Sequence, residues 1–255
     1  MKKLSMLTAF SCSTLIAACN GGTVGLQFQA VTDDGSAASS GDVVTDDAQT
    51  AFGLIDAQLH LRDIELDLPE GSKCGEVPEA AGTTCDESSN KIIIDGPFVI
   101  DLVTGQATPD LNNIEVPAGV YKRIDFRVED GDPDEGVVAA GSALDDRSFS
   151  GSFSFDDQGT PLTLRLSLRF NEDIRLEDPA GIDASGSAQS LLTKFNISAW
   201  FAGLDISGCL ANGELAIVDG EVLVDDDALS GSGDCSDIEN TLKTNMKNSG
   251  QIDKQ

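Results

Sequence analysis

The sequence predicts an all-β fold, an antiparallel β-sandwich with one C-terminal α-helix. Apolar and polar side chains alternate in several segments, which is typical of strands with one buried and one wet face. Turn-forming residues separate these segments about every 10–25 residues, as in a sandwich. Near the C-terminus the apolar spacing changes to four residues, which indicates a helix packed on the edge of the sandwich.

Residues 19–49 are predicted to be a flexible tether, followed by a single domain over residues 50–250. The segment is rich in Gly, Ser, Asp, Thr and Ala, so it has little apolar surface to offset the entropy lost on ordering. As a flexible coil it would separate its ends by roughly 30 Å. Within it, a short apolar patch at 24–31 is compatible with a strand.

The segment 57–68 changes its apolar phase in the middle. One set of apolar residues occupies odd positions and the next set even positions: Ala57, Leu59 and Leu61, then Ile64, Leu66 and Leu68. One extra residue near Arg62 and Asp63 would return both sets to one face, which predicts a strand with a β-bulge there. A helix that buries a similar number of apolar residues is the alternative.

Four later segments alternate in the same way and are expected to be strands: 98–102, 120–128, 149–155 and 162–170. In 120–128, Val120 and Ile124 fall on the apolar side. Tyr121 falls on the wet side, where its hydroxyl could hydrogen-bond back to a loop. Each of these segments is expected to bury one face against the core.

Two turn and cap signals define the C-terminal third. Asp219-Gly220 separates the apolar segments 215–218 and 221–224, which predicts a two-residue hairpin because both turn positions need positive φ. Ser236 and Glu239 match a capping box for a helix over 237–248.

The first eighteen residues have the features of a secretion signal. Lys2 and Lys3 precede an apolar stretch too short and too polar to span a bilayer. The sequence Ile16-Ala17-Ala18-Cys19 resembles the lipobox of bacterial lipoproteins. This resemblance implies cleavage before Cys19 and attachment of acyl chains such as palmitate to it, while plain cleavage after Ala18 is the alternative.

By resemblance to the sorting rule of Gram-negative lipoproteins, Asn20 at the second mature position favours the outer membrane. Several acyl chains on one residue give durable attachment to a lipid bilayer.

The chain is strongly acidic, with a formal net charge of −28 that becomes about −30 once Lys2 and Lys3 are removed. Such a surface repels nucleic acid and anionic headgroups, so lipid rather than a protein face is expected to hold the membrane.

Four cysteines remain beyond Cys19, and an even number in an exported chain predicts disulfides. Local pairing of Cys74 with Cys85 and of Cys209 with Cys235 is the simplest of three arrangements. A zinc site is the alternative, but neither pair has the spacing of a zinc motif.

The runs Phe98–Leu102 and Val116–Ile124, with Phe195–Phe201 and Asn245–Ser249, resemble β-rich bacterial envelope lipoproteins that carry a domain of unknown function. The resemblance implies an immunoglobulin- or prealbumin-like sandwich at the cell surface, and it supplies no catalytic residues. Trp200, the only tryptophan, is expected to anchor the core.

The chemistry-bearing residues are few, so no catalytic residue and no cofactor is predicted. His60 is the only histidine, and it is expected to be half-exposed on a strand. Without a second histidine, multi-histidine zinc or iron sites are excluded. Acidic residues are so numerous that a pair of them for glycosidic cleavage stays an open alternative.

Asp130, Asp132 and Asp134 offer oxygen ligands at alternate positions, as at the start of a calcium loop. Pro133, a late glycine and the missing bidentate glutamate depart from that pattern. A solvated turn is therefore the main interpretation of 130–136, as of the second acidic run at 225–234, and calcium is the alternative.

The sequence thus favours a non-enzymatic cell-envelope module, anchored through Cys19, that binds an unknown envelope protein or surface polymer. A carboxylate-based extracytoplasmic hydrolase and a calcium-stabilised adhesion module are the alternatives.

Overall fold

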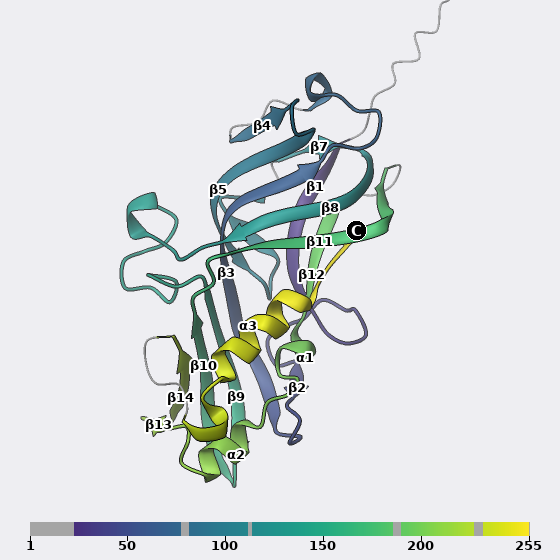
Figure 1. The fold of residues 1–255 in the computed structure, drawn as a ribbon. Helices are drawn as coiled ribbons and strands as arrows, with labels where there is room; N and C mark the ends of the chain where they lie inside the picture. The colour runs from purple at the N-terminus through teal and green to yellow at the C-terminus, as the bar shows by residue number, and fades with distance from the viewer. Residues whose placement is uncertain (1–22, 78–81, 112–113, 186–189, 227–231, 255) are drawn as a thin grey trace, which may run out of the picture.

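Two β-sheets, one large and one small, face each other across a shared apolar core in the computed structural model (Figure 1). The structure describes residues 23–77, 82–111, 114–185, 190–226 and 232–254. The small sheet has the order β15-β12-β1-β7. Its strands are β1 (Thr23–Val31), β7 (Val116–Pro117), β12 (Ser190–Asn196) and β15 (Gly250–Lys254).

The large sheet has the main order β11-β8-β3-β9-β10-β14-β13, and β2, β4, β5 and β6 join it through β3 and β5. Its strands are β2 (Val43–Thr45), β3 (Ala51–Asp67), β4 (Thr83–Asp86), β5 (Lys91–Asp101), β6 (Gln106–Thr108), β8 (Gly119–Val128), β9 (Phe149–Asp157), β10 (Thr160–Leu168), β11 (Glu172–Ala184), β13 (Ile217–Val218) and β14 (Glu221–Asp225). The predicted all-β sandwich is confirmed, with one refinement: β1 pairs with β12, and β10 with β14, in parallel.

The tether prediction is wrong for residues 23–49, because this segment belongs to the sandwich. Val24, Leu26, Phe28 and Ala30 are buried in the core, and β1 pairs with both β12 and β7. The strand at the apolar patch is therefore confirmed. Its alternating side chains face the large sheet, which supplies the burial that the local composition did not predict.

β3 confirms the predicted strand and bulge, and the helical alternative is wrong. Its register against β5 shifts between Leu61 and Asp63, so that Leu61 and Ile64 are both fully buried. A second shift against β9, between Leu54 and Asp56, was not predicted. Each shift moves the buried set from one alternate phase to the other.

Two residues expected on wet faces are buried. His60 has no exposed surface, because the chain leaving β8 and the chain entering β9 both lie against it: its Nδ1 is 2.7 Å from the Glu129 oxygen, and its amide donates to the Ser148 oxygen. Tyr121 is also buried, while Val120 is 42 % exposed, because the β8–β11 register shifts beyond Tyr121. The predicted hydrogen bond of its hydroxyl is present and goes to the Pro117 oxygen.

The helices are short and lie on the small-sheet side and at one end of the molecule: α1 (Ile197–Trp200), α2 (Ile206–Ala211) and α3 (Ile238–Asn248). The expected C-terminal helix is confirmed as α3, which buries Ile238, Leu242 and Met246. The capping box is wrong, because Asp237 is the N-cap and its side chain makes no cap bond. Trp200 is fully buried, as expected, and packs edge-on against Phe149 at 5.5 Å.

The hairpin prediction is confirmed. β13 and β14 pair antiparallel around Asp219 and Gly220, which have φ values of 54° and 83°. These are the positive φ values that a two-residue hairpin turn requires.

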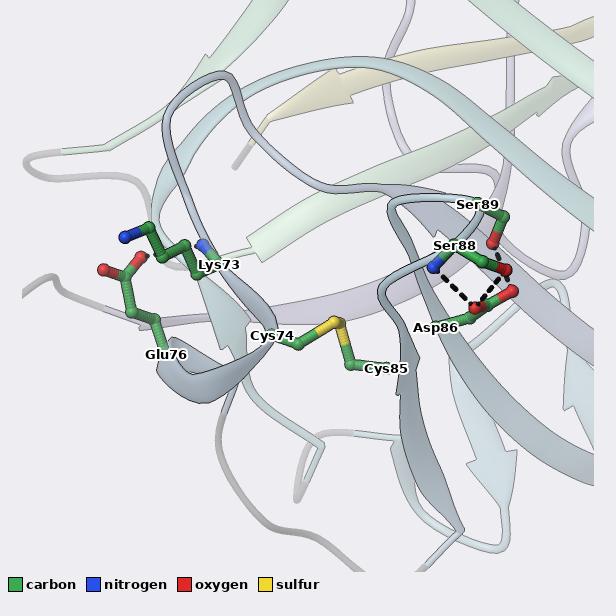
Figure 2. Close-up of a disulfide and its surroundings, with 7 residues drawn as sticks. All are labelled: Lys73, Cys74, Glu76, Cys85, Asp86, Ser88 and Ser89. Atoms are coloured by element: carbon green, nitrogen blue, oxygen red, sulfur yellow. Dashed lines mark hydrogen bonds between the residues drawn. A yellow bond between two sulfur atoms is a disulfide. The ribbon is translucent and has the colours of Figure 1, made fainter.

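Both predicted disulfides are present. Cys74 and Cys85 lie 5.4 Å apart at Cα, and Figure 2 shows their bond joining a 3₁₀ turn (Cys74–Glu76) to β4. Beside it, hydrogen bonds from Ser89 and Ser88 lower the pKa of Asp86 to about 2 and close the β4–β5 turn. Cys209 and Cys235 lie 5.9 Å apart and join α2 to the turn before α3.

Candidate functional site

Charged side chains cover the outer face of the large sheet where β11, β8, β3 and β5 lie side by side. On β3 and β8 every second residue faces the core, so the residues between them face outward. The outward residues carry charges of both signs: Asp63, Glu65, Asp67, Lys91, Arg123, Asp125, Arg127, Asp173, Arg175 and Glu177. Because four strands contribute, these charges form cross-strand rows.

Asp125 is the centre of this arrangement. Its carboxylate lies 2.9 Å from Arg123 Nη2, 3.0 Å from Arg175 Nε and 3.3 Å from Lys91 Nζ. In the strand register Asp125 is directly opposite Glu65, a like-charge pair that would be destabilising by itself. Lys91 contacts both carboxylates, at 2.5 Å from Glu65, and these hydrogen bonds raise the pKa of Lys91.

The rows continue to either side of Asp125. Toward the start of β8, Arg123 reaches Asp67 at 3.3 Å; toward its end, Arg127 reaches Asp173 at 3.2 Å. Beyond them Arg62 forms ion pairs with Glu129 and Glu135. The pairs form two networks on this face, one centred on Asp125 and one that runs from Asp173 through Arg127 and Glu129 to Arg62.

Three hollows lie along these ion pairs, and neighbouring hollows share lining residues. The largest, about 1310 Å³, lies over the end of β3 and the starts of β5 and β8, and is bordered by Pro69, Asn90, Gly119 and Asp183. Lys91 also lines the second, about 470 Å³ in volume. Asp63 and Arg127 then connect the second hollow to a third of about 480 Å³. We call these three hollows together the charged groove.

The charged groove concentrates positive charge in a chain with little of it. Arg62, Lys91, Lys122, Arg123, Arg127 and Arg175 all line it. The whole chain has only 16 lysines and arginines against 44 acidic residues, and two of the 16 lie in the signal. Six of the other 14 therefore line the groove, where bases are more frequent relative to acids than in the rest of the chain.

The residues of the calcium hypothesis do not converge. Asp130 lies 3.6 Å from Arg169, and burial raises the pKa of its carboxyl. Asp132 caps its own 3₁₀ turn (Pro133–Glu135) by accepting from the Asp134 amide, and Asp134 is exposed. Among the described residues these three carboxylates do not form a group of ligand atoms. Calcium at 130–136 stays a prediction without a formed ligand set.

In the second acidic run, Asp226 forms an ion pair with Lys243 and accepts a hydrogen bond from the Arg169 amide, while residues 227–231 lie outside the described part.

Within the described ranges, one group of possible metal ligands is brought together: Cys209, Glu214 and Cys235. Its two sulfur atoms form the second disulfide, and a thiolate is the form of cysteine that binds a metal. The group is therefore a buried structural bridge with a carboxylate beside it. The predicted lipidation site, Cys19, and the signal 1–18 lie outside the described residues.

Sequence reasoning missed the charged groove, although a signal was present. Residues 123–127 and 173–177 place opposite charges at alternate positions of two strands. Alternation within one strand predicts only that these charged residues face solvent. The pairing of Arg175 with Asp125 depends on the register between β11 and β8, which the sequence does not give.

None of the helices in the described ranges has the length and apolarity needed to cross a membrane. A scan of protein-family models and a search of curated proteins found no match. Among solved structures the chain is similar to "MbnP from Methylosinus trichosporium", with 13 % identity and a TM-score of 0.41 over 73 % of this chain and 79 % of that one. A similarity at this level carries no argument about function.

Proposed function

We propose that this protein is a lipid-anchored module of the bacterial cell envelope that binds a partner through its charged groove. The anchor rests on the signal and the lipobox-like sequence ending at Cys19, and Asn20 favours the outer membrane. The observation that supports binding is the groove itself, with three connected hollows over an ordered set of ion pairs.

The groove favours a partner with charged groups of both signs on an extended segment, such as part of an envelope protein. Exposed ion pairs each contribute only about 0–1 kcal/mol, so a partner's charges can exchange with them at little cost. The network around Asp125 is only partly exposed, with 15 % of that side chain accessible, and it holds Arg123 and Arg175 in place. Prearranged charges give specificity and rapid association that weaken with salt.

Cross-linking in intact cells tests the binding role. A photo-reactive amino acid would replace Val120, which lines the largest hollow, or Val218, which is 65 % exposed and lies far from it. We expect a discrete adduct from position 120 that weakens several-fold in Arg123→Gln and in high salt, and none from position 218. Arg165→Gln is the matched control, because its ion pair with Glu221 lies outside the groove.

An adduct that forms equally at both positions, or that is insensitive to Arg123→Gln, would contradict the groove as the binding surface.

The anchor is tested separately by the intact mass of protein extracted from membranes. We expect a mature chain that begins at Cys19 and carries the mass of its acyl chains. A chain that begins at Cys19 without acyl mass and is found in the soluble fraction would refute the anchor.

A further inference from the structure

We propose that the end of the sandwich where β1 begins lies directly against the lipid headgroups, and that the α2 end points away from the membrane. This inference rests on the proposed anchor at Cys19. It goes further by assigning a membrane-facing surface to the folded domain, with the headgroup layer as the surface it meets.

The length of chain between anchor and domain is the first argument. Only Asn20, Gly21 and Gly22 separate Cys19 from Thr23, the first residue of β1. Four residue steps span at most about 14 Å even when fully extended. β1 is fixed from its start, because Thr23 pairs with Pro117, and Val24 is buried. The start of β1 therefore cannot move more than about 14 Å from the acylated residue at the membrane surface.

The strand register shows which elements share this end, the β1 end. Thr23 lies beside Pro117, Gly119 beside Ala184, and Asp67 beside Lys91. The end of β3, the starts of β5, β7 and β8, and the end of β11 therefore gather where β1 begins. Figure 1 shows β1, β4 and β7 at one end of an elongated molecule and α2 with β13 at the other.

The long axis sets the distance between the two ends. β3 has 17 residues and runs from the α2 end to the β1 end. At roughly 3.3 Å per residue its contour length is about 55 Å, and the bends at its two register shifts make the end-to-end span shorter. With the β1 end on the headgroups, the α2 end would stand several Debye lengths above them.

Charge is distributed unequally along this axis, and this is the second argument. The β1 end carries both signs, with acids in excess: Lys73, Lys91, Lys122, Arg123 and Lys254 with Asp67, Glu70, Glu76, Asp86, Glu87, Glu115, Glu177, Asp178, Asp183 and Asp253. The α2 end is more strongly acidic: among the described residues it carries Asp42, Asp46, Asp47, Asp156, Asp157, Asp205, Glu214, Asp219, Glu221, Asp234 and Asp237 with Arg165 as the one base.

Anionic headgroups repel acidic protein surface within a Debye length, about 8 Å at physiological salt. The proposed orientation puts the less acidic end, which holds most of the bases of the two ends, inside that distance and the strongly acidic end far outside it. The largest hollow of the charged groove then opens near the membrane, so a partner would enter it at the level of the headgroups.

Fluorescence quenching in vesicles tests the orientation. The full acylated protein would be reconstituted in phosphatidylethanolamine and phosphatidylglycerol vesicles that contain lipids with nitroxide headgroups. A fluorescent amino acid would replace Glu87, in the β4–β5 turn, or Asn212, which caps α2; both are exposed. We expect at least three-fold stronger quenching at position 87 than at position 212.

A linker variant is the matched control. Insertion of about 24 Gly and Ser residues between Gly22 and Thr23 adds a flexible span of roughly 25–30 Å, so the difference in quenching should largely disappear. Equal quenching in the unmodified chain, or stronger quenching at position 212, would overturn the orientation.

The same vesicles separate this inference from the anchor. Protein that carries its acyl mass and floats with the vesicles, but shows no difference between positions 87 and 212, overturns the orientation alone. Protein that is not acylated and does not float overturns both.

Discussion

His60 is buried, with one ring nitrogen hydrogen-bonded and the other without a hydrogen-bond partner among the described residues. Nδ1 is 2.7 Å from the Glu129 carbonyl oxygen, which only accepts, so Nδ1 carries the proton of the neutral ring. Nε2 is buried without a partner among the described residues. Protonation would place a proton on Nε2 and a positive charge on a ring that is shielded from water. Burial therefore lowers the pKa of His60.

This residue should make stability depend on pH in a defined direction. Because the folded pKa lies below the unfolded value of about 6.5, the unfolded chain binds the proton more readily. The contribution of neutral His60 is present above pH 6.5 and is lost as the pH falls below it. We expect His60→Asn to be less stable than wild type at pH 7.5, with the difference in melting temperature narrowing toward pH 5.5.

Asparagine keeps a donor for the Glu129 carbonyl but does not titrate. A difference between the two proteins that stays constant over this pH range would show that the pKa of His60 is the same in the folded and unfolded states, and would contradict this prediction.

Single residues were the scale at which prediction from sequence failed most often. His60 and Tyr121 both lie beside register shifts, where the side chains of a strand change faces. The change at 61–64 was visible as a shift in apolar phase, but the loop that covers His60 was not. Burial of a polar strand residue depends on which distant segment crosses it, and periodicity holds no such information.

The β3 bulge is held by an unusually close approach of two strands. A Cβ atom at Gly96 in β5 would lie 1.9 Å from the backbone oxygen of Arg62. The bulge predicted from β3 therefore requires a glycine on the neighbouring strand.

Gly96→Ala should force these two backbones apart. We expect a loss of about 1–3 kcal/mol of stability, the usual cost of overpacking, measured as the shift in the urea midpoint. Gly75→Ala is the matched control, because no atom lies within 4 Å of its added Cβ. Equal midpoints for the two variants would contradict the close packing at the bulge.

Elements were predicted well where the pattern was long, and poorly where the flanking composition dominated. β10 and α3 each repeat their spacing over several positions, so their type could be predicted. β1 is a short apolar strand among Gly, Asp and Ser, and only its neighbours β12 and β7 make it part of the core. Parallel pairing likewise depends on the path of the chain rather than on local sequence.

At the scale of the whole molecule, residues 23–49 are part of the domain. Without β1, the core would lose Leu26 and Phe28, and β12 would lose its parallel partner. We expect a fragment of residues 23–255 to unfold cooperatively and a fragment of residues 50–255 to lose that behaviour. Near-ultraviolet circular dichroism, which reports the packing of Trp200, would follow both.

A 50–255 fragment with the same near-ultraviolet spectrum and a cooperative transition would restore the tether interpretation.

The charged groove also depends on the assembled molecule. Its charges are visible in the sequence, but their rows exist only after β11, β8, β3 and β5 have paired in register.

The place of β1 also determines how the domain bears mechanical load. β1 runs parallel to β12 in register from Gly25–Ser190 to Val31–Asn196. A pull on its N-terminal end acts along the strand, so these bonds are strained in shear and must rupture together. Peeling them away one by one would need a force across the strand. A force applied at the N-terminal end of β1 and directed along the strand therefore loads the β1–β12 hydrogen bonds in the direction that needs the largest force to break them.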